Sequence, residues 1–449
     1  MATENPDPKA PQPLFPKLPG GPSSMSPENI SRHQRRRLEG AMVEAVARHG
    51  YAATTLRELV TLASVSRSTF YEHFESKQDC FLASFDEIMA TVSARVAEAY
   101  REPDDFREQL VAGLRTFMQL ALDDPASAKL VAIDSLTVGT PGVAHRERAS
   151  QGFEVLIQQS FDHSPSAHRV SPLTVRAIVA GIRGVAYQHL RSGRGEQLPE
   201  TVEPLIDWTL GYQQEESELV RRAAAAAAEE YVAPSAPEPD DDEPSWAEPP
   251  DGERSRVMLS QRERIVRAAA RVVVERGYEK LSIPAISGAA GVSNQTFYEH
   301  FSSKQDAFLA AFEILAAEAL GTTTAAYREA GDRIEAIGIG VRAMLQHIAD
   351  NELFARLAFF ELPTAGPIAL DRADAILSSV GAFLQPGTTP SEIPGTSTPV
   401  LLEAIPSGIW GSIQHEIHQG RLDMLPELAP ELTRIALVPV AGRAALAQA

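Results

Sequence analysis

The sequence predicts an all-α protein built from two tandem copies of one helical unit. Apolar residues recur at helical spacing, as in Val43, Val46 and Ala47, and alternating strand patterns are hard to find. The chain also repeats itself at a fixed offset of 227 residues. VSRSTFYEHFESKQDCFLASF (Val65–Phe85) faces VSNQTFYEHFSSKQDAFLAAF (Val292–Phe312), with 16 of 21 positions identical. A period this long indicates two domains and not a solenoid.

The offset persists far beyond this motif. Gly181-Ile182 faces Gly408-Ile409, and Leu198-Pro199-Glu200 faces Leu425-Pro426-Glu427. The whole unit is therefore duplicated, and we call residues 32–222 copy 1 and 259–449 copy 2. In each copy the first helix is expected to stop at a Gly-Tyr pair, because glycine suits a left-handed cap. Longer apolar helical segments are expected downstream, at 106–122, 172–190, 200–219, 334–348, 400–417 and 426–446.

Charge and composition narrow the class of protein. The chain has 449 residues and a net charge of −19, but Ala223–Glu253 holds ten acidic residues and no Lys or Arg. The acidity is thus mostly a property of one segment, and a local basic face remains compatible with it. The single cysteine, Cys80, aligns with Ala307 in copy 2. The pair therefore indicates a position for a small core residue, and one cysteine cannot form an intrachain disulfide. With no signal-peptide pattern and no long apolar window, a cytoplasmic protein is expected.

Both copies contain a short helix, a tight turn and a second short helix. In copy 1 these are 56–63, Ser64-Val65-Ser66 and 67–74, and copy 2 repeats them at 284–301 around Gly291. A serine at the end of the turn is a typical N-cap, and the whole pattern predicts a helix-turn-helix. The side chains expected to lock the helices together are Leu59, Leu62, Val65 and Phe70, with Ile286, Ala289, Val292 and Phe297 in copy 2.

The second short helix carries residue types that suit DNA. Its first side chains would face base edges, and hydroxyl and basic groups around it would meet phosphates. Local charge agrees, since Arg32–Asp79 sums to +2 and Arg254–Asp306 to +4, from eight against six and nine against five charges. The predicted DNA-binding residues are Arg35, Arg36, Arg37, Ser66, Arg67, Ser68, Thr69, Tyr71, His73 and Lys77, and Arg262, Arg264, Ser293, Asn294, Gln295, Thr296, Tyr298, His300 and Lys304. The alternative for the arginines and histidines is a solvated face.

At these residues the sequence resembles the tetracycline-repressor (TetR/AcrR) family of regulators. The resemblance rests on Val-Ser-x-x-Thr-Phe-Tyr-x-His-Phe-x-Ser-Lys after a Gly-Tyr, and it covers residues 35–88 and 262–315. It implies a ligand-responsive repressor, in which three N-terminal helices read DNA and a larger helical domain dimerises and senses a small ligand. Ser64 departs from the glycine that the family's turn usually has. It is expected to fit if its backbone avoids the left-handed conformation.

The expected organisation follows from these segments. It comprises a disordered Pro-rich arm (1–31), DNA-binding head 1 (32–88), regulatory body 1 (89–222), an acidic Pro/Ala-rich linker (223–258), DNA-binding head 2 (259–315) and regulatory body 2 (316–449). The linker is long enough for the copies to pair within one chain. The hypothesis is an intrachain pseudo-dimer, with a homodimer as the alternative. Arg67 suits guanine whereas Asn294 and Gln295 suit adenine, which predicts an operator with unlike half-sites.

Ligand and catalytic signals are weaker. Aromatic and sulfur side chains on the body helices could line a cavity for a small apolar ligand, with ordinary core packing as the alternative. They are Phe117, Met118, Tyr187, Trp208, Phe354, Phe359, Phe360 and Trp410. His415-Glu416-Ile417-His418 lacks the spacing of a zinc-protease motif, and no cofactor, metal, membrane partner or enzymatic activity is expected. The competing function is a ligand-sensing or protein-interaction module in which one or both heads have lost DNA binding.

Overall fold

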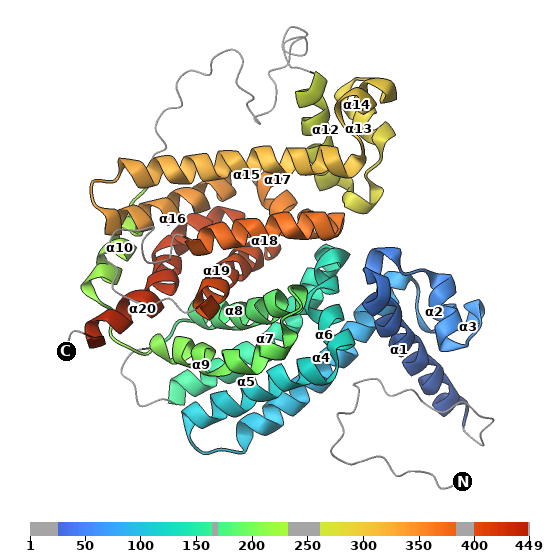
Figure 1. Cartoon of the computed structure of the whole chain (residues 1–449), viewed down its shortest axis with the longest axis horizontal. Coiled ribbons are helices and arrows are strands. Elements are labelled where there is room, and N and C mark those ends of the chain that lie inside the picture. The colour runs from blue at the N-terminus through green and yellow to red at the C-terminus, as the bar shows by residue number, and fades with distance from the viewer. Residues whose placement is uncertain (1–25, 164–168, 232–260, 383–398, 448–449) are drawn as a thin grey trace. The chain divides into compact units, whose positions relative to one another are not determined.

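The computed structural model describes residues 26–163, 169–231, 261–382 and 399–447. Within these ranges every regular element is a helix, which confirms the predicted all-α class (Figure 1). Most of the predicted arm and most of the predicted linker lie outside the described residues. The first described helix begins at Pro27, five residues before the expected start of head 1.

The chain forms two compact units. Unit 1 comprises Met1–Gln213 with Thr398–Gly408, and unit 2 comprises Gln214–Ser397 with Ile409–Ala449. Each unit therefore includes a segment of the other sequence copy. The start of the predicted linker, 223–228, is the end of a helix of unit 2, because a run of alanines continues the helix from Glu218.

Unit 1 contains two short DNA-binding-type helices between longer ones. Its elements are α1 (Pro27–Ala53), α2 (Leu56–Ala63), α3 (Arg67–His73), α4 (Lys77–Arg101), α5 (Phe106–Asp123), α6 (Pro125–Ala132), η1 (Asp134–Val138), α7 (Thr140–His163), α8 (Pro172–Arg191), η2 (Gly195–Thr201) and α9 (Val202–Gly211). Helix α1 is interrupted at Gly50, the predicted stop, where φ is 79°.

Unit 2 repeats this order at the same offset. Its elements are α10 (Glu218–Ala228), α12 (Gln261–Arg276), η3 (Tyr278–Lys280), α13 (Ile283–Ala290), α14 (Asn294–His300), α15 (Lys304–Glu329), α16 (Arg333–Asp350), α17 (Glu352–Arg356), η4 (Leu357–Glu361), η5 (Leu362–Ala365), α18 (Pro367–Ala382), η6 (Leu422–Leu428) and α20 (Ala429–Ala447). Helix α19 (Pro399–His418) contributes its first half to unit 1 and its second half to unit 2. Because α3, α4, α5, α7 and α8 begin 227 residues before α14, α15, α16, α18 and α19, the duplication extends through the bodies.

Each head is built around aromatic side chains. In head 1 the rings of Phe70, Phe74 and Phe81 are buried with Leu59 between α1 and α4. The predicted spacers Leu62 and Val65 are partly buried against this core. In head 2 Ile286 and Phe297 are buried as expected, but the prediction for Ala289 is wrong. That side chain is exposed, and Ala290 is buried instead, because it lies on the face of α13 that meets α12.

Helix α15 is long and apolar enough to cross a membrane by length and composition, with a mean hydropathy of 1.3. It is the counterpart of α4. Its side chains Phe308, Phe312 and Leu315 are buried within unit 2, as in the core helix of a globular unit.

Candidate nucleic-acid interface

The helix-turn-helix is present in both heads. Ser66 caps α3, since the backbone N–H of Thr69 donates to its Oγ at 3.0 Å, and Ser293 caps α14 through Thr296 at the same distance. Ser76 and Ser303 cap the following helices α4 and α15 in the same way. The Ser66 and Ser293 caps confirm the N-caps that the sequence predicts for the second short helices.

The turns of the two heads have the same backbone conformation. Ser64 has φ 48° and ψ 49°, and Gly291 has φ 64° and ψ 39°, so both are left-handed. The expectation that Ser64 avoids this conformation is therefore wrong. The N–H groups of Ser64 and Val65 donate to carbonyls of α2 at 3.1 and 3.0 Å, and this closed turn imposes the left-handed geometry on the serine.

Exchanging the two turn residues is expected to change head stability in opposite directions. A left-handed L-residue costs roughly 1–2 kcal/mol, and glycine loses about 0.4–1 kcal/mol more chain entropy on folding. Ser64→Gly should therefore raise the free energy of unfolding of head 1 by about 0.5–1 kcal/mol, and Gly291→Ser should lower that of head 2 similarly. Amide exchange in residues 40–84 and 265–311 measures each effect. Slower exchange in the Gly291→Ser head would contradict the expectation.

The side chains predicted to read bases lie on the open face of the second helix. Arg67 and Ser68 are exposed on α3, and Asn294 and Gln295 are exposed on α14. Buried Phe70 and Phe297 hold the opposite face of each helix. Tyr71 and Tyr298 are 51% and 60% exposed, which leaves both hydroxyls accessible, and the Arg67 guanidinium lies 5.8 Å from the Tyr71 ring. The arrangement leaves these groups available for contact with a groove and its phosphates.

The predicted phosphate-binding lysines also have an internal role. Lys77 Nζ donates to the carbonyls of Tyr51 and Thr54 at 2.9 and 3.1 Å. Lys304 Nζ donates to the carbonyls of Tyr278 and Leu281 at 3.3 and 2.9 Å, and burial lowers its pKa. Each ammonium group thus joins the start of the long helix to the segment that precedes the helix-turn-helix. Their contact with phosphate stays a prediction.

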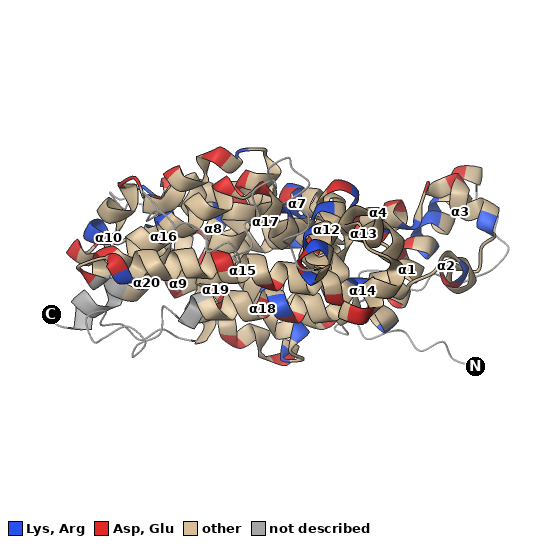
Figure 2. Cartoon of the chain, turned by 90° about the horizontal axis from the view of Figure 1, so that it is seen from above, with Lys and Arg blue, Asp and Glu red and all other residues tan. Residues whose placement is uncertain are grey.

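The arginines ahead of each helix-turn-helix divide into three kinds. Arg35 and Arg262 cover aromatic rings, with the guanidinium carbon 4.5 Å from Phe74 and 5.1 Å from Phe301. Arg37 and its counterpart Arg264 donate to the turn carbonyls, among them Ser64 at 3.3 Å and Gly291 at 2.6 Å. Arg36 is exposed. Figure 2 shows basic positions on the helices of both heads, interspersed with acidic ones.

The two histidines differ in their surroundings. His73 is half-buried, and its Nε2 is buried without a hydrogen-bond partner among the described residues. Burial, with a smaller contribution from the charge of Arg35, lowers the pKa of His73. His300 is exposed, with Nε2 at 3.4 Å from Gln261 Oε1. The imidazole at the end of the second helix is therefore half-buried in head 1 and exposed in head 2.

An acidic side chain connects each head to its body. The backbone N–H of Tyr51 donates to Asp134 Oδ1 at 3.3 Å, and that of Tyr278 donates to Glu361 Oε2 at 2.9 Å. Neither acid is among the site residues predicted from the sequence. Their signal was available, because Asp134 and Glu361 are 227 residues apart and both are acidic.

Unit 1 contains a mainly apolar cavity of about 130 Å³, lined by residues of α4 to α9. Of the predicted ligand-binding residues, Phe117 lines it, whereas Met118, Tyr187 and Trp208 are buried in the packing around it. Arg146 and Arg183 also line the cavity and were not predicted, because a lone arginine on a helix normally indicates a surface. The apolar lining is Phe85, Met89, Val96, Leu110, Leu114, Phe117, Val131, Ala132, Phe153, Leu156, Ile157, Val179, Ile182, Ala186 and Ile206, with neighbouring Gly113 and Ala149.

The predicted aromatic residues of body 2 pack tightly. The rings of Phe359 and Trp410 are stacked with centroids 4.0 Å apart and planes at 23°. Phe354 and Phe360 are buried beside His347 and His418, at 5.9 and 6.3 Å between ring centroids. Phe354, Phe359 and Phe360 are thus core residues of unit 2, and Trp410 is partly buried.

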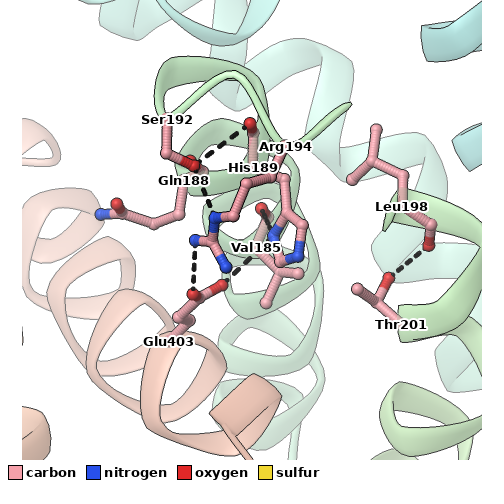
Figure 3. Close-up of polar contacts among 8 residues, drawn as sticks. All are labelled: Val185, Gln188, His189, Ser192, Arg194, Leu198, Thr201 and Glu403. Atoms are coloured by element: carbon pink, nitrogen blue, oxygen red, sulfur yellow. Dashed lines mark hydrogen bonds and ion pairs between the residues drawn. The ribbon is translucent and has the colours of Figure 1, made fainter. Parts of the chain in front are cut away.

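A polar cluster holds the first half of α19 in unit 1 (Figure 3). Glu403 Oε1 accepts from Arg194 Nη2 at 3.0 Å, and Glu403 Oε2 lies 3.3 Å from Nδ1 of buried His189. Burial would raise the pKa of Glu403, but the neighbouring side chains of His189 and Arg194 lower it below its ordinary value. Nearby, small residues allow α8 and α19 to touch. A Cβ on Gly181 would lie 2.7 Å from the carbonyl oxygen of Ala404.

Comparison with known proteins places these features in a family. The sequence profile described as "Bacterial regulatory proteins, tetR family" matches residues 40–84 and 265–311, one match in each head. The HTH-type transcriptional activator FasR of Mycolicibacterium smegmatis is 31% identical over 189 residues, which is 40% of this chain and 84% of that protein. The HTH-type transcriptional regulator TcmR of Streptomyces glaucescens is 30% identical over 126 residues, and the chain spans half of its length.

Solved structures give more distant similarities. FadR from Bacillus subtilis, in complex with stearoyl-CoA, has a TM-score of 0.36 and 16% identity, covering 39% of this chain and 97% of that chain. FadR from Bacillus halodurans has a TM-score of 0.38 and 17% identity, covering 43% of this chain and all of that chain.

Proposed function

This chain belongs to the tetR family of bacterial regulatory proteins and is a DNA-binding transcriptional regulator, and from that premise we propose that its two heads read two unlike half-sites of one operator. The carrying observation is the difference between otherwise matching second helices. Helix α3 exposes Arg67, whereas α14 exposes Asn294 and Gln295. An arginine pairs with guanine N7 and O6, and an amide pairs with adenine N6 and N7. The cytoplasm, where such a regulator meets its DNA, is the proposed location.

Pairing of the two copies within one chain is part of the proposal. It is supported by reciprocal contacts inside unit 1. Gly181 packs against Ala404, and Gly408, its counterpart, packs against Ala177, the counterpart of Ala404. Reciprocity of this kind is typical of a two-fold interface between like units. Sedimentation at micromolar concentration should give a single species of 48.6 kDa, and an obligate dimer would contradict the pairing.

Control by a small apolar ligand is proposed from the cavity of unit 1. Phe85 and Met89 of α4 line one wall, and Val131 and Ala132 of α6 line another. Both walls are connected to head 1. Helix α4 begins in the head, at Lys77. Helix α6 is followed by η1, whose Asp134 accepts a hydrogen bond from the backbone N–H of Tyr51 in the head. A ligand that displaces α6 would move this acid, and with it the helix-turn-helix. Release of a repressor is the proposed outcome, and a run-off transcription assay with and without ligand determines the sign.

Selection of binding sites from a random DNA library tests the proposal. At about 0.15 M salt, where non-specific binding is weak, we expect one enriched site with two different halves. A perfect palindrome would indicate two chains that use the same head. Failure to enrich any site, without and with candidate ligands, would favour the interaction-module function.

Single substitutions in the two reading helices are expected to act on different halves of that site. Arg67→Ala should weaken binding by about 1–3 kcal/mol through one half-site, and Asn294→Ala by a similar amount through the other. Fluorescence anisotropy with operators mutated in one half at a time measures both effects. An equal effect of Arg67→Ala on both halves would contradict the assignment.

A further inference from the structure

We propose that the chain carries one ligand site, the cavity of unit 1, and that this site takes an apolar molecule with a carboxylate bound by Arg146 and Arg183. The inference deepens the proposed function and rests on it, since it names the ligand class and the body that senses it. Three features of the described residues support it: the composition of the cavity, the state of its two arginines, and the residues at the matching positions of unit 2.

The cavity is largely apolar, and its polar lining residues are Tyr100, Ser150 and Thr209 together with two arginines. Its walls are aliphatic and aromatic, and among its described lining residues Arg146 and Arg183 alone carry charge. Arg146 belongs to α7 and Arg183 to α8. The Nη1 group of Arg183 donates a hydrogen bond to the hydroxyl of Ser150, which also belongs to α7. An occupant therefore meets a mainly apolar surface, a few hydroxyl groups and one pair of charged groups, the two guanidinium groups. A hydrophobic body with a single anionic head matches this surface.

Both arginines retain unused hydrogen-bonding capacity. Arg146 Nη1 and Arg183 Nε are buried without a hydrogen-bond partner in the described part of the chain. Burial, together with the charge of Arg183, lowers the pKa of Arg146 to about 9, and burial also lowers the pKa of Arg183. The negative charges of Glu147 and Glu154 partly offset the lowering of the pKa of Arg183. A carboxylate would supply acceptors in the planar geometry that guanidinium groups bind best.

Unit 2 has other residues at the matching positions. Adding the repeat offset of 227 to each position gives the unit 2 counterpart. The counterparts of Arg183, Arg146 and the cavity-lining Ala132 are Trp410, Ala373 and Phe359, in that order. Trp410 and Phe359 are the stacked pair, so two cavity-lining positions of unit 1 become packed aromatic rings in unit 2. At these described positions unit 2 thus has packed rings in place of cavity wall and no cation in place of either arginine, and we assign ligand binding to unit 1.

Titration calorimetry of the full chain with decanoate, and with decanol as its neutral counterpart, tests the site. We expect one decanoate per chain. Arg183→Met should weaken decanoate binding about tenfold or more while decanol changes by less than about twofold, because a buried charged hydrogen bond is lost. Arg146→Met should act in the same direction. Arg95→Met, at an exposed position of α4, is the matched control and should leave both titrations unchanged.

A second variant tests the location by filling the space. Ala132→Phe places the residue of unit 2 into unit 1 and should abolish binding of both probes, with the helical circular dichroism retained. Two decanoates per chain, no decanoate binding, or an equal loss of both probes in Arg183→Met would each overturn the proposal. In the DNA-site selection performed without ligand, an enriched operator together with no decanoate binding would overturn this ligand site and leave the proposed DNA reading standing. Decanoate binding without an enriched operator would instead overturn the proposed function.

Discussion

Phe297→Ala is expected to lower the free energy of unfolding of head 2 by about 3–5 kcal/mol, the usual cost of truncating a buried aromatic residue. The Phe297 side chain is 0% exposed, and its ring lies 5.9 Å from that of Phe301. Helix α14 has only seven residues, so little of its own hydrogen bonding can compensate for the lost packing. Amide exchange measured by mass spectrometry should speed up throughout residues 265–311.

Head 1 provides the matched comparison. Phe70 is equally buried, so Phe70→Ala should speed exchange in residues 40–84 and leave head 2 unchanged. Tyr298→Phe is the control within head 2, because it removes only the hydroxyl of a side chain that is 60% exposed. It should leave exchange unchanged while weakening DNA binding. If Phe297→Ala speeded exchange equally in both heads, the two heads would not be separate folding units.

In the wild type, titration of Asp134 is expected to lower the free energy of unfolding by up to about 3 kcal/mol as the pH rises from roughly 4 to 6. Asp134→Asn is expected to remove this decline. Burial raises the pKa of Asp134 from 3.8 to about 6, although Lys129 and the Tyr51 N–H act in the opposite direction. The folded protein therefore holds this proton to higher pH than the unfolded chain does. The contribution is fully favourable below the unfolded pKa and declines as the pH rises through the folded pKa.

Urea unfolding of wild type and variant across that pH range measures the difference in slope. The asparagine keeps an oxygen that can accept from the Tyr51 N–H but has no proton to lose, so its slope should be flatter. A constant offset in stability between the two proteins does not affect this comparison. Glu39, whose pKa burial raises to about 7, adds a decline of the same sign in both proteins. Identical slopes would show that Asp134 does not titrate as described.

Local signals explain how much of the site could be predicted. The helix-turn-helix depends on residues close in sequence, namely the caps Ser66 and Ser293 and the buried rings Phe70 and Phe297, and these patterns are legible without a structure. The register of the repeat also predicts the shared order of helices. The conformation of Ser64 was mispredicted because the closed turn, not the residue preference, decides it.

Long-range contacts explain what could not be predicted. Arg183 and Glu403 are polar residues on amphipathic helices, where the sequence alone indicates solvent. Arg183 instead lines a cavity, and Glu403 meets Arg194, which is 209 residues away. The sequence assigns Lys77 to phosphate, because the backbone carbonyls of Tyr51 and Thr54 become its neighbours only when α4 packs against α1.

If Arg67 and Asn294 read different half-sites as proposed, the unlike side chains on α3 and α14 give the bound chain a direction on DNA. A regulator with two identical heads forms the same complex when its operator is turned around. A chain that binds through Arg67 at one half-site and Asn294 at the other does not, because turning the operator exchanges the unit that faces the promoter. Inverting the site in front of a reporter gene would then change the polarity of the bound chain while its affinity for the site stays the same.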